Sequence, residues 1–144
     1  MNELDQTYSD QPIINIHGEL VALGPRHRDH VPLFLRWIND FAVTRTYGMH
    51  FRTRTLEAMQ ANYEEGSKGG RDYADFTIYE RATLRPIGST ALAEIDHFDR
   101  TAKYGILIGE QRCWGKGYGT ETTRLMLDYG FTGLGAAQYR SDRL

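Results

Sequence analysis

The sequence predicts an α+β domain built on a mixed, mostly antiparallel sheet that is flanked by helices. Three observations indicate this class. Apolar residues recur at helical spacing near residues 29–39, three short segments between residues 75 and 108 have strand character, and a glycine-rich stretch leads into a last amphipathic helix. Because short turns join the three strand segments, they are expected to pair as an antiparallel meander.

The first half of the chain supplies an early strand and two helices. The β-prone run Glu19–Leu23 is closed by a Gly-Pro pair, which favours a turn. Asp29 is a suitable N-cap for the first helix, with Pro32 inside its first turn, where a missing N–H does no harm. A second helix is predicted to begin at Thr55. The segment 45–51 between them is interpreted as an irregular connector.

The length of 144 residues suits one domain. Residues 1–17 have little periodic apolar content, so they are expected to form a loosely ordered tail, and residues 18–144 to form the domain. With 40% hydrophobic and 25% charged residues, the composition is that of a globular protein rather than a disordered one.

Charge and cysteine content limit the environment and the partners. A formal net charge of −2 provides no field that would collect nucleic acid or an acidic membrane, so neither is expected as a partner. The single cysteine, Cys113, excludes an internal disulfide and fits a reducing compartment. No apolar run approaches the roughly 18 residues of a membrane span, and the polar, acidic N-terminus is unlike a secretory signal. A cytoplasmic location is therefore expected.

The glycine-rich stretch Arg112–Gly119 has the chemistry of an anion site. It follows a strand (104–108) and opens a helix predicted to run from about Gly119 to Phe131. The first N–H groups of a helix have no intrahelical partner, and the helix dipole adds partial positive charge to them. Glycines let the backbone approach a phosphate closely, and Arg112 and Lys116 add two full charges. A seat for a pyrophosphate is predicted.

Two familiar phosphate loops do not fit. The P-loop requires a Lys followed by Ser or Thr, but Lys116 precedes a glycine. The dinucleotide fingerprint requires G-x-G-x-x-G in a parallel βαβ unit, whereas this loop has the pattern G-x-G-x-G after strands of antiparallel character. A third pattern, [QR]-x-x-G-x-[GA], is met by Arg112–Gly117.

The segment Ile106–Glu121 resembles motif A of the GNAT acetyltransferase superfamily, in particular the branch of ribosomal-protein N-terminal, spermidine and aminoglycoside N-acetyltransferases. The run Trp-Gly-Lys-Gly-Tyr-Gly-Thr-Glu and the preceding strand Ile87–Asp96 carry the resemblance, which extends more loosely over residues 18–135. It implies the acyl-CoA N-acyltransferase fold and acetyl transfer from acetyl-CoA to a primary amine. The acceptor would be a protein N-terminus, a polyamine or a small molecule.

The resemblance also implies a cofactor site. Backbone groups of the strand would face the pantetheine and the thioester, and amides of the loop would hold the pyrophosphate. The residues implied in acetyl-CoA binding are Ile106, Leu107, Ile108, Arg112, Cys113, Trp114, Gly115, Lys116, Gly117, Tyr118, Gly119 and Thr120. Trp114 is interpreted as an anchor that packs on the core rather than as a platform for the adenine.

Candidates for other chemistry are few. Glu94 lies on a predicted strand and is the candidate general base, although a solvated strand face near a turn would look the same. No histidine partner is placed beside Cys113, so a thiol nucleophile is not expected. His27 and His30 lack the carboxylate pattern of a metal site, and no metal is predicted.

The C-terminal residues depart from the family pattern. Residues 136–144 are mostly polar, unlike the apolar fifth strand expected there, and the family motif Asn-x-x-Ala-x-x-x-Tyr is absent, so Tyr139 receives no catalytic role. The chain is therefore expected to lack the C-terminal part of the fold and to leave the edge of strand 104–108 open. Either a second copy covers that edge in a homo-oligomer such as a dimer, or the domain binds CoA without catalytic activity.

Overall fold

The structure, a computed structural model, describes residues 11–46, 53–70, 72–133 and 138–141. One sheet contains six strands in sequence order, and all neighbouring strands are antiparallel except β5 and β6, which are parallel. The predicted class, a mixed and mostly antiparallel sheet flanked by helices, is confirmed. The strands are β1 (Ile16–His17), β2 (Val21–Gly24), β3 (Ala74–Glu80), β4 (Pro86–Asp96), β5 (Thr101–Ile108) and β6 (Gln138–Ser141).

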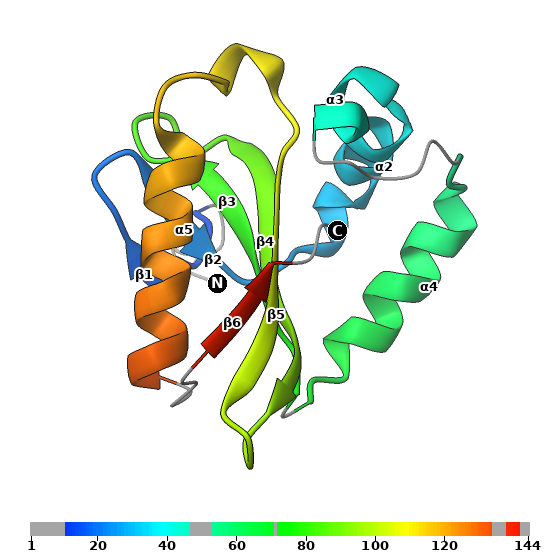
Figure 1. The fold of residues 1–144 in the computed structure, drawn as a ribbon. Coiled ribbons are helices and arrows are strands. Elements are labelled where there is room, and N and C mark those ends of the chain that lie inside the picture. The colour runs from blue at the N-terminus through cyan, green and yellow to red at the C-terminus, as the bar shows by residue number, and fades with distance from the viewer. Residues whose placement is uncertain (1–10, 47–52, 71, 134–137, 142–144) are drawn as a thin grey trace, which may run out of the picture.

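Helices cover both faces of the sheet, α5 on one side and the other three on the opposite side (Figure 1). The α5 face buries Met126 against Ile78, Leu92 and other aliphatic side chains of the sheet. On the opposite face, Phe34 and Trp37 pack with Leu107. Each such side chain contributes about 1.5–3 kcal/mol when fully buried, so the two clusters hold the layers together. The helices are α2 (Val31–Asn39), α3 (Phe41–Thr46), α4 (Leu56–Ser67) and α5 (Tyr118–Asp128).

The predicted helix starts are confirmed at α4 and wrong at α2. The Thr55 hydroxyl accepts a hydrogen bond from the Ala58 amide (3.1 Å), as an N-cap does. Asp29 instead lies in a short 3-10 turn, and α2 begins two residues later, after His30. The reason is local, because the Asp29 amide donates to the ring nitrogen Nδ1 of His27 (3.1 Å) and the turn forms first.

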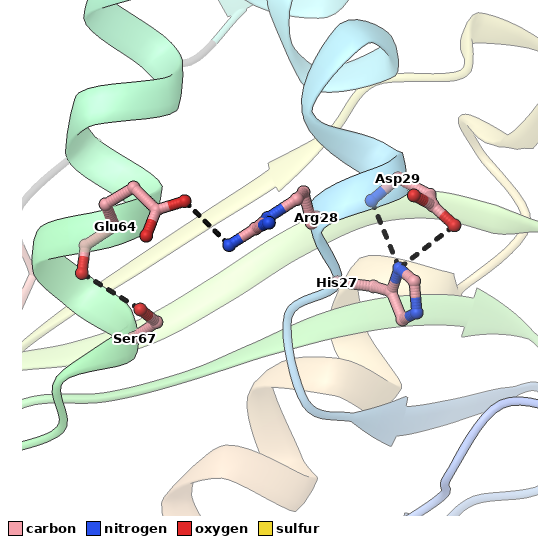
Figure 2. A network of polar contacts seen from close by, with 5 residues as sticks. All are labelled: His27, Arg28, Asp29, Glu64 and Ser67. Atoms are coloured by element: carbon pink, nitrogen blue, oxygen red, sulfur yellow. Dashed lines mark hydrogen bonds and ion pairs between the residues drawn. The ribbon is translucent and has the colours of Figure 1, made fainter.

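Helix α4 has no fully buried side chain, and polar contacts help to hold it against the rest of the domain. Figure 2 shows Arg28 reaching from the turn before α2 to Glu64 on α4, at 2.8 Å between Nη2 and Oε1. Exposed pairs of this kind contribute about 0–1 kcal/mol, so the attachment of α4 is weak compared with that of α2. The sequence did not indicate α3, whose six residues are too few to show a period, and residues 47–51 of the predicted connector lie outside the described ranges.

Both ends of the chain differ from expectation. The tail was expected to extend to residue 17, but Ile16 and His17 pair with Leu23 and Ala22 as a strand. At the other end, the expected absence of a fifth strand after the helix is wrong. Strand β6 pairs in parallel with Thr101–Tyr104 of β5. Backbone pairing alone defines this short strand, so it needs no apolar sequence.

The edge of β5 is therefore covered along its first half. The described part of β6 ends opposite Tyr104, and from Gly105 onward β5 has no neighbouring strand on that side among the described elements. Association of two copies through this edge stays a prediction. None of the described helices combines the length and the apolar composition needed to span a bilayer.

Burial of His30 leads to a prediction about pH. Its ring packs edge-on against Phe34 and Tyr79, and desolvation together with the neighbouring His27 lowers the pKa of His30 below its usual 6.5. The folded chain binds a proton at His30 less readily than the unfolded chain does. The contribution of the neutral His30 ring to the free energy of unfolding is therefore fully present above pH 6.5 and is lost as pH falls below that value. We expect the free energy of unfolding to decrease between pH 7 and pH 5. In urea titrations, the variant His30→Gln should show a smaller decrease over the same interval.

Candidate functional site

The loop between β5 and α5 adopts a conformation that requires two of its glycines. After Ile108 the chain makes a 3-10 turn at Gln111–Cys113, and Gly115 and Gly117 then have φ values of 75° and 85°. Other residues pay roughly 1–2 kcal/mol to adopt this left-handed region. A Cβ atom built on Gly115 would meet nothing within 4 Å, so backbone conformation rather than crowding demands glycine there. A Cβ on Gly119 would likewise meet nothing within 4 Å, so the space beside these two glycines is open.

The start of α5 presents unpaired amides to this open space. The Glu121 amide is the first to donate back along the chain, to the Gly117 carbonyl (3.0 Å). The amides of Tyr118, Gly119 and Thr120 precede it and have no acceptor among the described residues. Together with the helix dipole, they create positive potential where an anion can be bound.

Two cations, Arg112 and Lys116, belong to the same loop. Lys116 is exposed within the loop, and the Arg112 side chain is 44% exposed. The amides of Cys113 and Trp114 donate instead to the carbonyls of Glu110 and Gln111, inside the 3-10 turn. The amides of Cys113 and Trp114 are therefore not available to a diphosphate. The candidate residues that remain are the loop from Gly115 to Thr120 and the two cations.

Trp114 anchors the loop to the sheet. Its indole N–H donates to the Ile108 carbonyl (2.9 Å), and its ring packs against the core clusters on both faces. Cys113 is 1% exposed within the α5-side core, and burial raises the pKa of its thiol. An ionised, accessible thiol is thus disfavoured. On the opposite side, Gly109 lies against Trp37, and a Cβ there would come within 2.1 Å of the indole ring.

A carboxylate that sequence analysis missed joins the two sides of the loop. Glu80, the last residue of β3, accepts a hydrogen bond from the Tyr118 hydroxyl (2.8 Å) and lies 3.5 Å from the Arg112 guanidinium. Its other oxygen accepts from the Thr83 hydroxyl (2.9 Å). The Tyr118 bond, then the Thr83 bond, hold the pKa of Glu80 below its usual range, so the carboxylate is ionised at neutral pH. Nothing in the local pattern around Glu80 signals this role, because Tyr118 is 38 positions away.

The strand β5 presents alternate backbone groups to its two neighbours. The Gly109 amide donates to the Ile87 carbonyl (2.8 Å), which sets the phase of the β4–β5 ladder. Leu107 therefore directs its backbone groups toward β4, and Ile106 directs its own away from β4. Of the three strand residues implied in pantetheine binding, Ile106 has the required orientation. Leu107 has its backbone in the ladder and its side chain in the core, and the Ile108 carbonyl is bonded to Trp114.

The candidate base Glu94 lies in a bulge of β4. The register shifts between Ala93 and Asp96, and Glu94 has a φ of 49°. Its side chain is 62% exposed and forms an ion pair with Lys103 of β5 (2.6 Å). Lys103 pairs with Arg140 of β6 and lies one residue before the last described pair of these strands, Tyr104 with Ser141, which is ~3 Å along the strand. Non-glycine residues in this region of backbone space are uncommon and often mark functional sites, as do bulges.

A second carboxylate fixes the start of α5. Glu121 is 5% exposed, and its Oε1 accepts hydrogen bonds from the amides of Leu20 (2.8 Å) and Val21 (2.9 Å) at the start of β2. Gly18 lies directly against it, and a Cβ at that position would come within 2.1 Å of Oε1. Within the described ranges, no group of three or more His, Cys, Asp and Glu side chains is placed to hold a metal ion.

An antiparallel sheet whose fifth strand runs through a glycine loop into a helix covering one face defines the class of GNAT-type folds. The family model for the acetyltransferase (GNAT) domain matches residues 20–142, and the chain belongs to this family. Human alpha/beta-tubulin-N-acetyltransferase 9 is 29% identical over 137 residues, which cover 86% of this chain and 64% of that protein. The chain thus spans less than two thirds of the length of this curated relative.

Solved structures share the fold. Spermidine N-acetyltransferase from Vibrio cholerae, in complex with CoA and spermine, superposes with a TM-score of 0.73 at 20% identity, over 83% of this chain and 68% of that one. A Vibrio cholerae protein described as a ribosomal-protein-serine acetyltransferase gives a TM-score of 0.72 at 19% identity, over 91% and 74% of the two chains. At these identities the likeness concerns the fold alone.

Proposed function

We propose that this chain transfers the acetyl group of acetyl-CoA to a primary amine. The single observation that carries the proposal is the loop after β5. Its unpaired amides from Tyr118 to Thr120 and its cations Arg112 and Lys116 fit the diphosphate of a CoA ester. Membership of the GNAT family, together with relatives described as N-acetyltransferases, supports the chemistry.

Different residues would bind the diphosphate and the pantetheine arm of acetyl-CoA. Amides from Gly115 to Thr120, with Arg112 and Lys116, would hold the diphosphate, and the outward backbone groups of Ile106 would align the pantetheine arm as an added strand does. Acetyl-CoA supplies an acetyl group activated as a thioester. Trp114 would act through its contacts, by keeping the loop against Ile108.

Glu94 is the proposed general base. An ammonium group must lose a proton before its nitrogen can attack a carbonyl carbon, and a carboxylate can accept that proton through a water molecule. The bulge turns Glu94 out of the regular ladder, and its carboxylate is held by an ion pair with Lys103. One proton would leave the ammonium for Glu94, and the new C–N bond would replace the C–S bond. The second proton that the nitrogen gives up would pass to the thiolate, so that CoA departs as its thiol.

The test is thiol release by the chain with acetyl-CoA and a panel of amines. Spermidine is the acceptor named for one structural relative, and a peptide with a free α-amino group represents a protein N-terminus. Thiol release that depends on one of these amines supports the proposal. Binding of CoA in a calorimeter without thiol release from any amine would favour a CoA-binding domain without catalytic activity, and no binding at all would refute both.

The role of Glu94 has its own expected result. The variant Glu94→Gln keeps the shape of the bulge but removes the basic oxygen, so kcat should fall by about 10²-fold or more while KM for acetyl-CoA stays unchanged. Lys103→Met removes the ion-pair partner but keeps the carboxylate, so its kcat should fall less than that of Glu94→Gln. Wild-type kcat in Glu94→Gln would show that the base lies elsewhere.

A further inference from the structure

Glu80 bonds to residues on both sides of the glycine loop. Arg112 lies before Gly115 and Gly117, and Tyr118 lies after them, yet the same carboxylate oxygen contacts both side chains. The carboxylate comes from β3, a strand that belongs to the rigid sheet. At 8% residue exposure, it is withdrawn from solvent and held by the Thr83 hydroxyl as well.

A negative charge beside an anion site needs an explanation. By Coulomb attraction alone, a diphosphate would bind better without a neighbouring carboxylate. A withdrawn carboxylate also costs desolvation free energy, which its hydrogen bonds offset. Glu80 therefore weakens binding unless it contributes something that the loop lacks.

The glycines that follow the Trp114 anchor have little intrinsic preference for one backbone conformation. Glycine has more backbone conformations to lose than any other residue, and two glycines with positive φ separate Arg112 from the first turn of α5. Without a cross-link, ordering the cation and the amides around an anion would cost entropy at the moment of binding. A contact that orders them beforehand raises affinity by removing that cost.

We propose that Glu80 is a positioning residue, which holds the Tyr118 hydroxyl and the Arg112 guanidinium so that the amides of α5 and the cation are arranged for the diphosphate before it binds. This inference rests on the proposed function. Glu80 acts through Arg112 and Tyr118 and touches no reacting atom.

The sharpest test is the variant Tyr118→Phe, which removes one hydroxyl and leaves the ring and the backbone in place. Tyr118 is only partly buried, so the fold should persist, as a thermal unfolding curve can show. In calorimetry with coenzyme A, Kd should rise roughly ten- to a hundredfold, as expected for the loss of a hydrogen bond to a charged group. Glu80→Ala should raise it at least as much, and the double variant should be no weaker than Glu80→Ala alone.

Two controls separate positioning from simple electrostatics. Glu110→Gln removes a nearby negative charge, which bonds neither to Tyr118 nor to Arg112 in the described contacts, and should leave Kd unchanged or slightly lower. Pantetheine lacks the diphosphate, so its affinity should be the same in wild type and in Tyr118→Phe. In turnover, Tyr118→Phe should raise KM for acetyl-CoA with kcat unchanged.

The outcomes distinguish this inference from the proposed function. If wild type binds coenzyme A but Tyr118→Phe binds it equally well, or if Glu80→Ala binds it more tightly, Glu80 does not position the loop and the proposed function stands. Equal losses of coenzyme A and pantetheine affinity would also overturn the positioning role. A wild-type chain that does not bind coenzyme A overturns the proposed function and this inference with it.

Discussion

Replacing Gly117 by Asp should greatly weaken the binding of coenzyme A while leaving the domain folded. Two unit charges of the same sign about 4 Å apart near a protein surface repel each other by about 4 kcal/mol. A carboxylate at the start of α5 would face the diphosphate, so Kd should rise by a factor of roughly 10²–10³. The fold should survive, because a Cβ at this position would have only one protein contact, the Leu20 methyl at 3.7 Å. Asp tolerates positive φ better than most residues.

Gly117→Asn is the matched control. Asn has nearly the same shape as Asp and a similar tolerance of the left-handed region, so both variants carry the same backbone strain. The two side chains differ in that Asn has no charge. Calorimetry with coenzyme A should show a much smaller loss for Asn than for Asp, and the two variants should unfold at similar temperatures. Equal losses for both would place the effect in the backbone and contradict an anion site at this position.

Replacing Glu121 by Ala should cause the largest loss of stability among the substitutions considered. Its Oε1 is the acceptor for the amides of Leu20 and Val21, and Val21 is fully buried. Removing the acceptor leaves these donors unpaired and also opens a cavity, at a cost of about 3 kcal/mol. For a chain of this length, the expected drop in Tm is roughly 10 °C, measured by circular dichroism.

Two further variants isolate the cause. Glu121→Gln retains an oxygen that can accept both hydrogen bonds, so it should lose about 1 kcal/mol, mainly the assistance of the charge. Arg124→Ala should have little effect, because its guanidinium lies at 4.0 Å from the other carboxylate oxygen and is largely exposed. A Glu121→Ala variant as stable as wild type would show that Leu20 and Val21 find other acceptors.

The parts of this molecule that sequence analysis predicted are those in which neighbouring residues determine the structure. The meander of β3, β4 and β5 follows from alternation and short turns, and the anion loop follows from glycines between a strand and a helix. Thr55 caps α4 because an N-cap acts three residues away. Each of these features lies within one short window of the chain.

The parts that it missed depend on residues far apart in the chain. Glu80 is an ordinary strand residue until α5 brings Tyr118 to it, and Glu121 shows its role only when β2 is placed beside it. Strand β6 was missed for a different reason. Apolar alternation reports burial of side chains, whereas this strand is defined by the backbone pairing with β5.

The contact between Gly18 and Glu121 has an evolutionary consequence. Any side chain at position 18 would occupy the volume of the carboxylate that serves the amides of β2. A shorter residue at position 121 would leave room for that side chain but would give up the acceptor. The two positions are 103 residues apart in the sequence. We therefore expect substitutions at positions 18 and 121 to occur together among relatives.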